Sequence, residues 1–207
     1  MPTHAALALS LPIEMRVAGL GVSSVARLVR PDGCVVARAG MNVFDTEGEA
    51  LIHADDARSR LLARVVQGGS FNFRSSYTLR APDGAPLGEV ASEPGPAFWR
   101  TAMTARMADA HAAPFRIRAT SAVAEGISDF LGKLPLLGAA VDAVAKVRYE
   151  VVRGDAACVA VIDRMPSAIG ECYSMRRTSR LTPEEQSFCA LFMLVALALD
   201  GARSRGG

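Results

Sequence analysis

Five arginines in two short stretches of this 207-residue chain have the side-chain chemistry best suited to binding a ligand. A guanidinium donates paired hydrogen bonds to phosphate and carboxylate groups and stays charged at physiological pH. If the fold brings the two stretches together, they would form a patch for anionic lipid headgroups, with each arginine contributing about 1 kcal/mol. The alternative is a solvated surface whose charges discourage aggregation. The five residues are Arg116, Arg118, Arg176, Arg177 and Arg180.

Metal ligands are sparse, because the three histidines of the chain lie far apart in the sequence. The stretch His-Ala-Asp-Asp at 53–56 offers two ligand types, but no second ligand cluster accompanies it. We therefore expect a solvated turn at this position, with no metal and no cofactor.

Motifs of catalysis and nucleotide binding are incomplete in this chain. The stretch GLGVSS at 19–24 lacks the third glycine of a dinucleotide-binding turn. The stretch GISDFLGK at 126–133 has five residues between its glycines instead of four, and Leu134 replaces the Ser or Thr of a phosphate loop. No G-x-S-x-G nucleophile elbow occurs. We therefore expect a protein that is not an enzyme.

The composition is typical of a globular protein in a reducing compartment. Half of the residues (50%) are hydrophobic and 21% are charged, which argues against disorder. The net charge of +2 is too small to indicate a nucleic-acid partner. The apolar run at 5–13 lacks the basic start and the cleavage site of a signal peptide, so we expect a cytoplasmic protein. We predict small buried hydrophobic side chains for the four cysteines, Cys34, Cys158, Cys172 and Cys189.

Alternating runs of apolar and polar residues predict about twelve β-strands. Five hairpins are indicated by short turns, most of which contain glycine, between runs rich in Val, Leu and Ile. The stretches near 61–66 and 172–180 add two further strands, and residues 1–20 are expected to be irregular. In FRIRAT, Phe115 and Ile117 point to one face while Arg116 and Arg118 point to the other, which must be solvated. The expected turns lie at 31–33, 46–48, 82–84, 109–113 and 154–155.

The stretch SFCALFMLVALAL predicts a helix that is buried on every side. Twelve consecutive apolar residues run from Phe188 to Leu199, and a bilayer-spanning helix needs about 20. Thr182 and Glu185 form a capping box and Gly201 ends the helix, so we predict a helix over 182–201. A helix without a polar face must be enclosed, and closed antiparallel sheets enclose helices. We therefore predict one domain over 1–207, mainly β: a closed antiparallel barrel of about 12 strands around a central hydrophobic C-terminal helix.

Two features leave their structural role open. The segment 121–148 is either a connection over the barrel mouth or an amphipathic segment that touches a membrane. Trp99 either closes one end of the barrel or lies at a membrane interface.

The order of several segments resembles that of the Tubby C-terminal-like superfamily, which includes the phospholipid scramblases and the LURP-one-related proteins. The resemblance covers about 25–207 and implies a twelve-stranded barrel around a hydrophobic C-terminal helix. The usual Asp-Gly-like turn is replaced by Ala-His-Ala-Ala at 110–113, and the basic headgroup-binding residues of true Tubby proteins do not align with specific positions here. The matching segments are YTLRAPDGAPLGEV, GPAFWRTAMTARMADAHAAPFRIRA, LPLLG, YEVVRGDAACVAVIDR and LTPEEQSFCALFMLVALALDGARSRGG.

Together, the arginines and the resemblance lead us to expect a non-enzymatic, monomeric binding protein that contacts anionic phospholipid or a membrane surface. Contact with the membrane would be peripheral, because no segment is long enough to span it. A soluble scaffold or regulatory module that binds another protein is the alternative. Phospholipid scrambling, which only the resemblance implies, is a third and weaker expectation.

Overall fold

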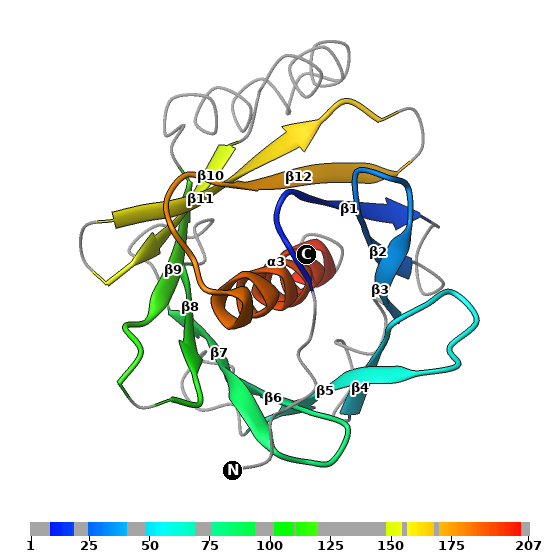
Figure 1. Ribbon diagram of the computed structural model, residues 1–207, viewed down its shortest axis with the longest axis horizontal. Coiled ribbons are helices and arrows are strands. Elements are labelled where there is room, and N and C mark those ends of the chain that lie inside the picture. The colour runs from blue at the N-terminus through cyan, green and yellow to red at the C-terminus, as the bar shows by residue number, and fades with distance from the viewer. Residues whose placement is uncertain are drawn as a thin grey trace.

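The computed structural model describes residues 9–18, 25–40, 49–68, 76–93, 102–109, 111–119, 148–154, 157–167 and 170–203. Within these residues twelve strands form one closed antiparallel barrel, and a single C-terminal helix packs inside it (Figure 1). The predicted fold class is thereby confirmed. The strands are β1 (Ile13–Ala18), β2 (Val25–Val29), β3 (Val35–Gly40), β4 (Glu49–His53), β5 (Leu61–Gln67), β6 (Ser76–Arg80), β7 (Pro86–Glu93), β8 (Ala102–Met107), β9 (Phe115–Ala119), β10 (Arg148–Arg153), β11 (Ala157–Met165) and β12 (Glu171–Arg177).

Each strand pairs with its neighbours in sequence, and the pairing of β1 with β12 closes the ring. An up-and-down order of this kind leaves no unpaired edge along which another chain could add a strand. The order also alternates the turns between the two ends of the barrel. The described turns, between β2 and β3, β4 and β5, and β6 and β7, lie at one end, which we call the proximal end. The last residue of β10 and the first residue of β11 lie at the same end.

Helix α3 (Pro183–Arg203) begins at the proximal end and runs through the interior of the barrel (Figure 1). Its start follows the predicted capping box, whereas its end lies at Arg203, two residues beyond the predicted stop at Gly201. The Thr182 amide donates to Glu185 Oε2 at 2.8 Å, and the Glu185 amide donates to Thr182 Oγ1 at 3.2 Å. Glu184 and Glu185 in the first turn also interact favourably with the positive end of the helix dipole.

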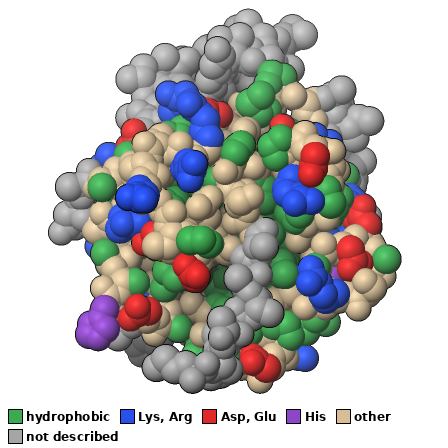
Figure 2. Space-filling model, viewed as in Figure 1, with side chains coloured by type: hydrophobic (Ala, Val, Ile, Leu, Met, Phe, Trp, Pro, Cys, Tyr) green, Lys and Arg blue, Asp and Glu red, His purple; other side chains and the backbone are tan. Residues whose placement is uncertain are grey.

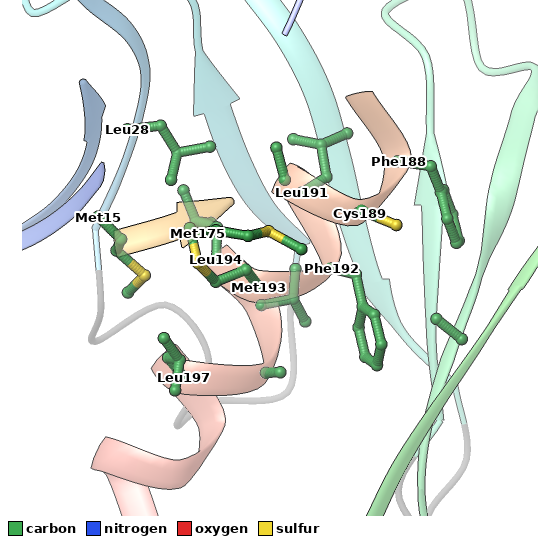
Figure 3. Close-up of a cluster of buried hydrophobic side chains, with 14 of the residues drawn as sticks. Met15, Leu28, Met175, Phe188, Cys189, Leu191, Phe192, Met193, Leu194 and Leu197 are labelled. Carbon is green, nitrogen blue, oxygen red and sulfur yellow. The ribbon is translucent and has the colours of Figure 1, made fainter. Parts of the chain in front are cut away.

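Small side chains on the inner wall make room for the helix. Alternate residues of a strand face the interior, and on several strands these residues are alanines. The helix in return supplies large side chains, and every residue from Phe188 to Ala198 is buried (Figure 3). Small wall residues opposite large helix residues allow the close packing that protein interiors require. The fully buried wall alanines include Ala26, Ala37, Ala39, Ala50, Ala63, Ala105 and Ala160.

The N-terminal residues enter the barrel instead of being irregular throughout 1–20. Leu9 and Leu11 are buried, and the Leu11 amide donates to Gln186 Oε1 at 3.1 Å. The Leu9 amide donates to Ser187 Oγ at 3.2 Å. These bonds satisfy two polar side chains at the start of the otherwise apolar helix. Strand β1 follows directly, and its alternation of buried Ile13, Met15 and Val17 was a period-2 signal already present in the sequence.

Three of the expected turns contain the predicted glycine in the left-handed conformation. Gly33, Gly84 and Gly154 have φ of +84°, +87° and +59°. An L side chain is disfavoured there, which explains the choice of glycine. The expected turn at 46–48, Trp99 and almost all of the segment 121–148 lie outside the described residues.

In the part of the chain that the structure describes, no helix combines the length and the apolar character needed to cross a membrane.

Candidate anion-binding surfaces

The five predicted arginines separate into two groups according to their position along the barrel wall. Arg116 lies next to the start of β9 and opposite Val152, so it is near the proximal end. Arg177 is the last residue of β12, and Arg180 lies in the connection from β12 to α3. All three are exposed. In Figure 2, which views the molecule along the barrel, Lys and Arg side chains gather over its β10–β11 side.

Arg153, which the sequence interpretation did not single out, belongs to this same region. It lies opposite Phe115 at the end of β10, and its guanidinium carbon stands 5.8 Å from the centre of the Phe115 ring. Its Nη2 lies 2.7 Å from Glu185 Oε1 and donates to the Arg180 carbonyl at 3.4 Å. Arg153 therefore ties the first turn of α3 to the barrel wall. The remaining members, Arg116, Arg177 and Arg180, are called the rim arginines below.

Two of the rim arginines form no ion pair with any described residue. Among the described residues, neither Arg177 nor Arg180 has an ion-pair partner. Glu185 is engaged by Arg153 and by the helix cap, so it does not neutralise them. An exposed guanidinium without a partner keeps all of its donors available for an anion.

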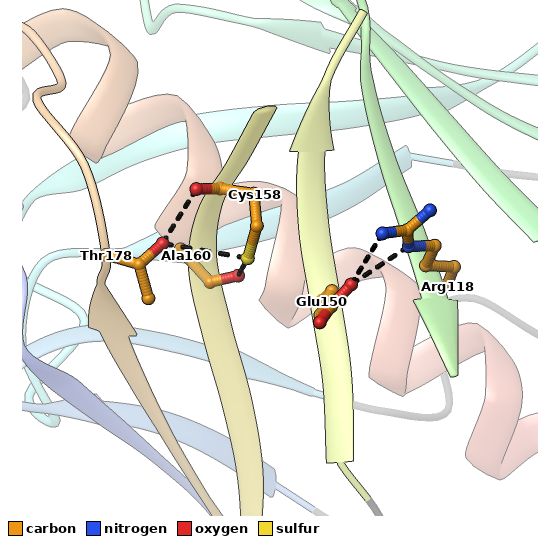
Figure 4. Close-up of polar contacts among 5 residues, drawn as sticks. All are labelled: Arg118, Glu150, Cys158, Ala160 and Thr178. Carbon is orange, nitrogen blue, oxygen red and sulfur yellow. Dashed lines mark hydrogen bonds and ion pairs between the residues drawn. The ribbon is translucent and has the colours of Figure 1, made fainter. Parts of the chain in front are cut away.

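Arg118 and Arg176 lie farther from the proximal end, on the outer wall, and both form ion pairs. Arg118 donates from Nε and Nη2 to Glu150 Oε2 at 3.0 and 2.8 Å (Figure 4). Glu150 pairs across to Val161, and Val161 pairs across to Arg176, so the two arginines share one row that crosses four strands. Arg176 Nε lies 3.4 Å from Asp163 Oδ2. The predicted patch of five is therefore not a single cationic surface.

Asp163 holds two arginines at once on this outer wall. Arg148 Nε donates to Asp163 Oδ1 at 2.7 Å, and Arg176 contacts Oδ2. Partial burial of the carboxyl opposes its ionisation, but the hydrogen bonds and charges of Arg148 and Arg176 outweigh this and lower the pKa of Asp163. The ladder from β9 to β12 is thus a stabilised set of ion pairs.

A second group of basic residues lies on strands β1 to β4, which continue the barrel wall from β1 in the direction away from β12. The sequence interpretation missed this group. Arg16 of β1 pairs directly with Arg27 of β2, Arg27 pairs with Arg38 of β3, and Arg38 pairs with His53 of β4. These four residues are called the β1–β4 row. Each sits at an outward position of an alternating strand, which was the signal available in the sequence. Their alignment depends on register, which alternation does not reveal.

The cysteines differ in environment more than the sequence led us to expect. Cys189 is buried in the helix, and burial followed by the charge of Glu185 raises the pKa of its thiol to about 12. Burial also raises the pKa of Cys172. Cys158 accepts from the Thr178 hydroxyl at 3.6 Å (Figure 4). Cys34 is exposed in the turn between β2 and β3, so the prediction of a buried side chain is wrong there. Cys158 and Cys172 are only partly buried.

No group of three or more His, Cys, Asp or Glu side chains among the described residues is arranged to hold a metal ion. His53 and Asp56 lie near each other in sequence, but Asp56 is directed to arginines, with Oδ1 2.6 Å from Arg27 Nε. Comparison with protein-family models, with curated proteins and with solved structures gives no match to this chain.

Proposed function

We propose that this protein is a non-enzymatic binding protein that attaches peripherally to anionic phospholipid surfaces through its rim arginines. The observation that carries the proposal is the exposure of Arg177 and Arg180 without an ion-pair partner among the described residues. Each basic residue near an anionic membrane contributes about 1 kcal/mol, so a small group gives weak and reversible attachment.

Attachment of this kind would be electrostatic, because the described surface offers little apolar area for insertion. The large hydrophobic side chains exposed there are Leu51 on β4 and Met165 on β11. Five strand-to-strand steps around the ring separate these two strands, so the two side chains do not form one patch. For the same reason the described residues give no support to the alternative of an apolar docking site for another protein.

The resemblance to the Tubby C-terminal-like superfamily supports the same proposal. We propose membership in that superfamily on the order of the sequence segments and on the predicted barrel with its central helix. A scaffold of this type presents turns at the end of a rigid barrel, where exposed arginines meet a flat surface without rearrangement of the core.

Liposome flotation at low salt tests the proposal, with vesicles of phosphatidylcholine alone or mixed with phosphatidylserine. The double variant Arg177→Gln/Arg180→Gln removes two charges from the rim. The control variant Arg118→Gln/Arg176→Gln removes two charges from the outer wall, where both arginines are ion-paired. We expect the wild type and the control to float with anionic vesicles and the rim variant to bind about thirtyfold more weakly, since it loses about 1 kcal/mol for each arginine.

Two results would overturn the proposal. One is the failure of the wild type to float with anionic vesicles at low salt, where screening is weakest. The other is equal weakening of the rim variant and the control, since this would indicate a dependence on net charge and not on the rim.

A further inference from the structure

The β1–β4 row places three guanidinium groups side by side on one face of the barrel. Directly opposed residues on neighbouring antiparallel strands have Cβ atoms about 5 Å apart. Arg16, Arg27 and Arg38 are opposed in this way across two strand pairs, and His53 continues the row on β4. Like charges in opposed positions destabilise a sheet, so packing of the barrel does not explain this arrangement.

The carboxylates near the row do not match its charge. Glu14 contacts Arg16 at 2.7 Å and leaves the other two arginines untouched. Asp56 Oδ1 accepts a hydrogen bond from Arg27 Nε at 2.6 Å and lies 3.5 Å from Arg38 Nε. Two carboxylates therefore face three guanidinium groups, as they also do on the β9–β12 wall. What sets the row apart is the state of Arg38.

Arg38 is the member of the row with the least satisfied side chain. Only 13% of its side chain is exposed, and its guanidinium donates no hydrogen bond to any described residue. Its Nε is buried without a hydrogen-bond partner among them. A half-satisfied buried cation costs free energy, and an oxyanion bound beside it would recover that cost.

We propose that Arg27 and Arg38, flanked by Arg16 and His53, form a binding site for a phosphoryl dianion. A phosphomonoester or pyrophosphate group carries several oxygens and two or more negative charges, which suits adjacent planar guanidinium groups. Asp56 is the internal carboxylate that occupies one donor of Arg27, so it competes with the bound anion. This site is independent of the rim arginines, which lie on β9, on β12 and in the connection from β12 to α3.

Isothermal titration calorimetry with inorganic pyrophosphate tests the soluble form of the ligand. Flotation with vesicles that contain phosphatidic acid, whose headgroup is a phosphomonoester, tests the lipid form against phosphatidylserine vesicles of equal surface charge. Four single variants serve both assays: Arg38→Gln, Arg27→Gln, Asp56→Asn and Arg64→Gln. Arg64 is the matched control because it lies on the outer face of β5 and is paired with Glu49 at 3.0 Å.

We expect Arg38→Gln and Arg27→Gln each to weaken binding about tenfold or more, since each removes a charge-assisted hydrogen bond. We expect Asp56→Asn to strengthen binding and Arg64→Gln to change it less than about threefold. Arg27 is the more exposed of the two row positions, with 31% of its side chain accessible, so its variant remains informative if Arg38→Gln fails to fold.

Binding of pyrophosphate alone would identify a soluble phosphorylated ligand, and preference for phosphatidic acid vesicles alone would identify a lipid headgroup. The absence of both pyrophosphate binding and a preference for phosphatidic acid would overturn the proposal. It would also be overturned if Arg64→Gln weakened binding as much as the Arg27 and Arg38 variants, or if Asp56→Asn weakened binding. The rim variant Arg177→Gln/Arg180→Gln should retain pyrophosphate binding, so failure of the proposed function and failure of this site are distinguishable.

Discussion

The ring of Phe188 packs directly onto the backbone of Gly88. Phe188 lies in the first turns of α3, and Gly88 is an inward-facing residue of β7. A Cβ atom at position 88 would collide with the Phe188 ring and with the Arg106 carbonyl of the neighbouring strand. The Phe188 ring also lies near the Phe115 ring, at a centroid distance of 6.1 Å and an interplanar angle of 44°. The missing side chain of Gly88 therefore allows the helix to enter the barrel at this point.

Gly88→Ala should destabilise the protein by about 1–3 kcal/mol, because one added methyl overpacks the interior. Gly84→Ala is the matched control, since a Cβ there meets no atom within 4 Å and only the positive φ of +87° is strained. We expect the control to cost about 1 kcal/mol. Urea denaturation followed by circular dichroism measures both, and a harmless Gly88→Ala would contradict the close contact.

Leu194→Ala should destabilise the protein by about 2–5 kcal/mol, because its side chain is fully enclosed and truncation leaves a cavity. Leu51→Ala provides the comparison, because Leu51 is exposed on the outer wall. Its truncation should lower the free energy of unfolding by less than about 1 kcal/mol. Chemical denaturation of both variants gives the two values. If both variants lost a similarly small amount of stability, solvent or lipid, and not the barrel, would surround the helix.

The Asp163 carboxylate should make stability depend on pH in the acidic range. Its pKa is lowered in the folded state, so the unfolded chain takes up the proton first as the pH falls. The stabilisation is complete above the ordinary aspartate pKa of about 3.9 and is lost as the pH falls through the folded-state pKa. The difference in unfolding free energy between the wild type and Asp163→Asn should therefore narrow below about pH 4.

Asp83→Asn is the control for this pH series, because Asp83 lies in a turn and has no ion pair among the described residues. The difference in unfolding free energy between Asp83→Asn and the wild type should change less over the same pH range. A gap between the wild type and Asp163→Asn that stays constant down to pH 2 would be inconsistent with the ion pairs of Asp163.

Thiol labelling should distinguish Cys34 from Cys189. Cys34 is exposed and should react with maleimide in the native protein, whereas Cys189 is enclosed and its pKa is raised to about 12. Mass spectrometry of labelled peptides, with and without denaturant, measures both sites. Rapid native labelling of Cys189 would show that the helix leaves the barrel easily.

The sequence was sufficient to predict the architecture because the deciding signals are local. A run of apolar residues from Phe188 to Leu199 has no polar face, and its length rules out a bilayer span. The Thr182–Glu185 cap and the glycine turns depend only on residues a few positions apart, and the structure confirms them. Strand β1 was missed although the alternation of Ile13, Met15 and Val17 was visible in the sequence.

The sequence by itself thus determined that a hydrophobic helix is enclosed by strands and that Arg116 and Arg118 face outward. Only the tertiary structure decided which charges meet. Period-2 alternation assigns a residue to a face but leaves the register between strands open, and ring closure joins residues as distant as Arg16 and Cys172. For that reason only the folded barrel shows that Arg118 forms an ion pair with Glu150 and that Arg176 forms one with Asp163. The alignment of the β1–β4 row likewise depends on the strand register.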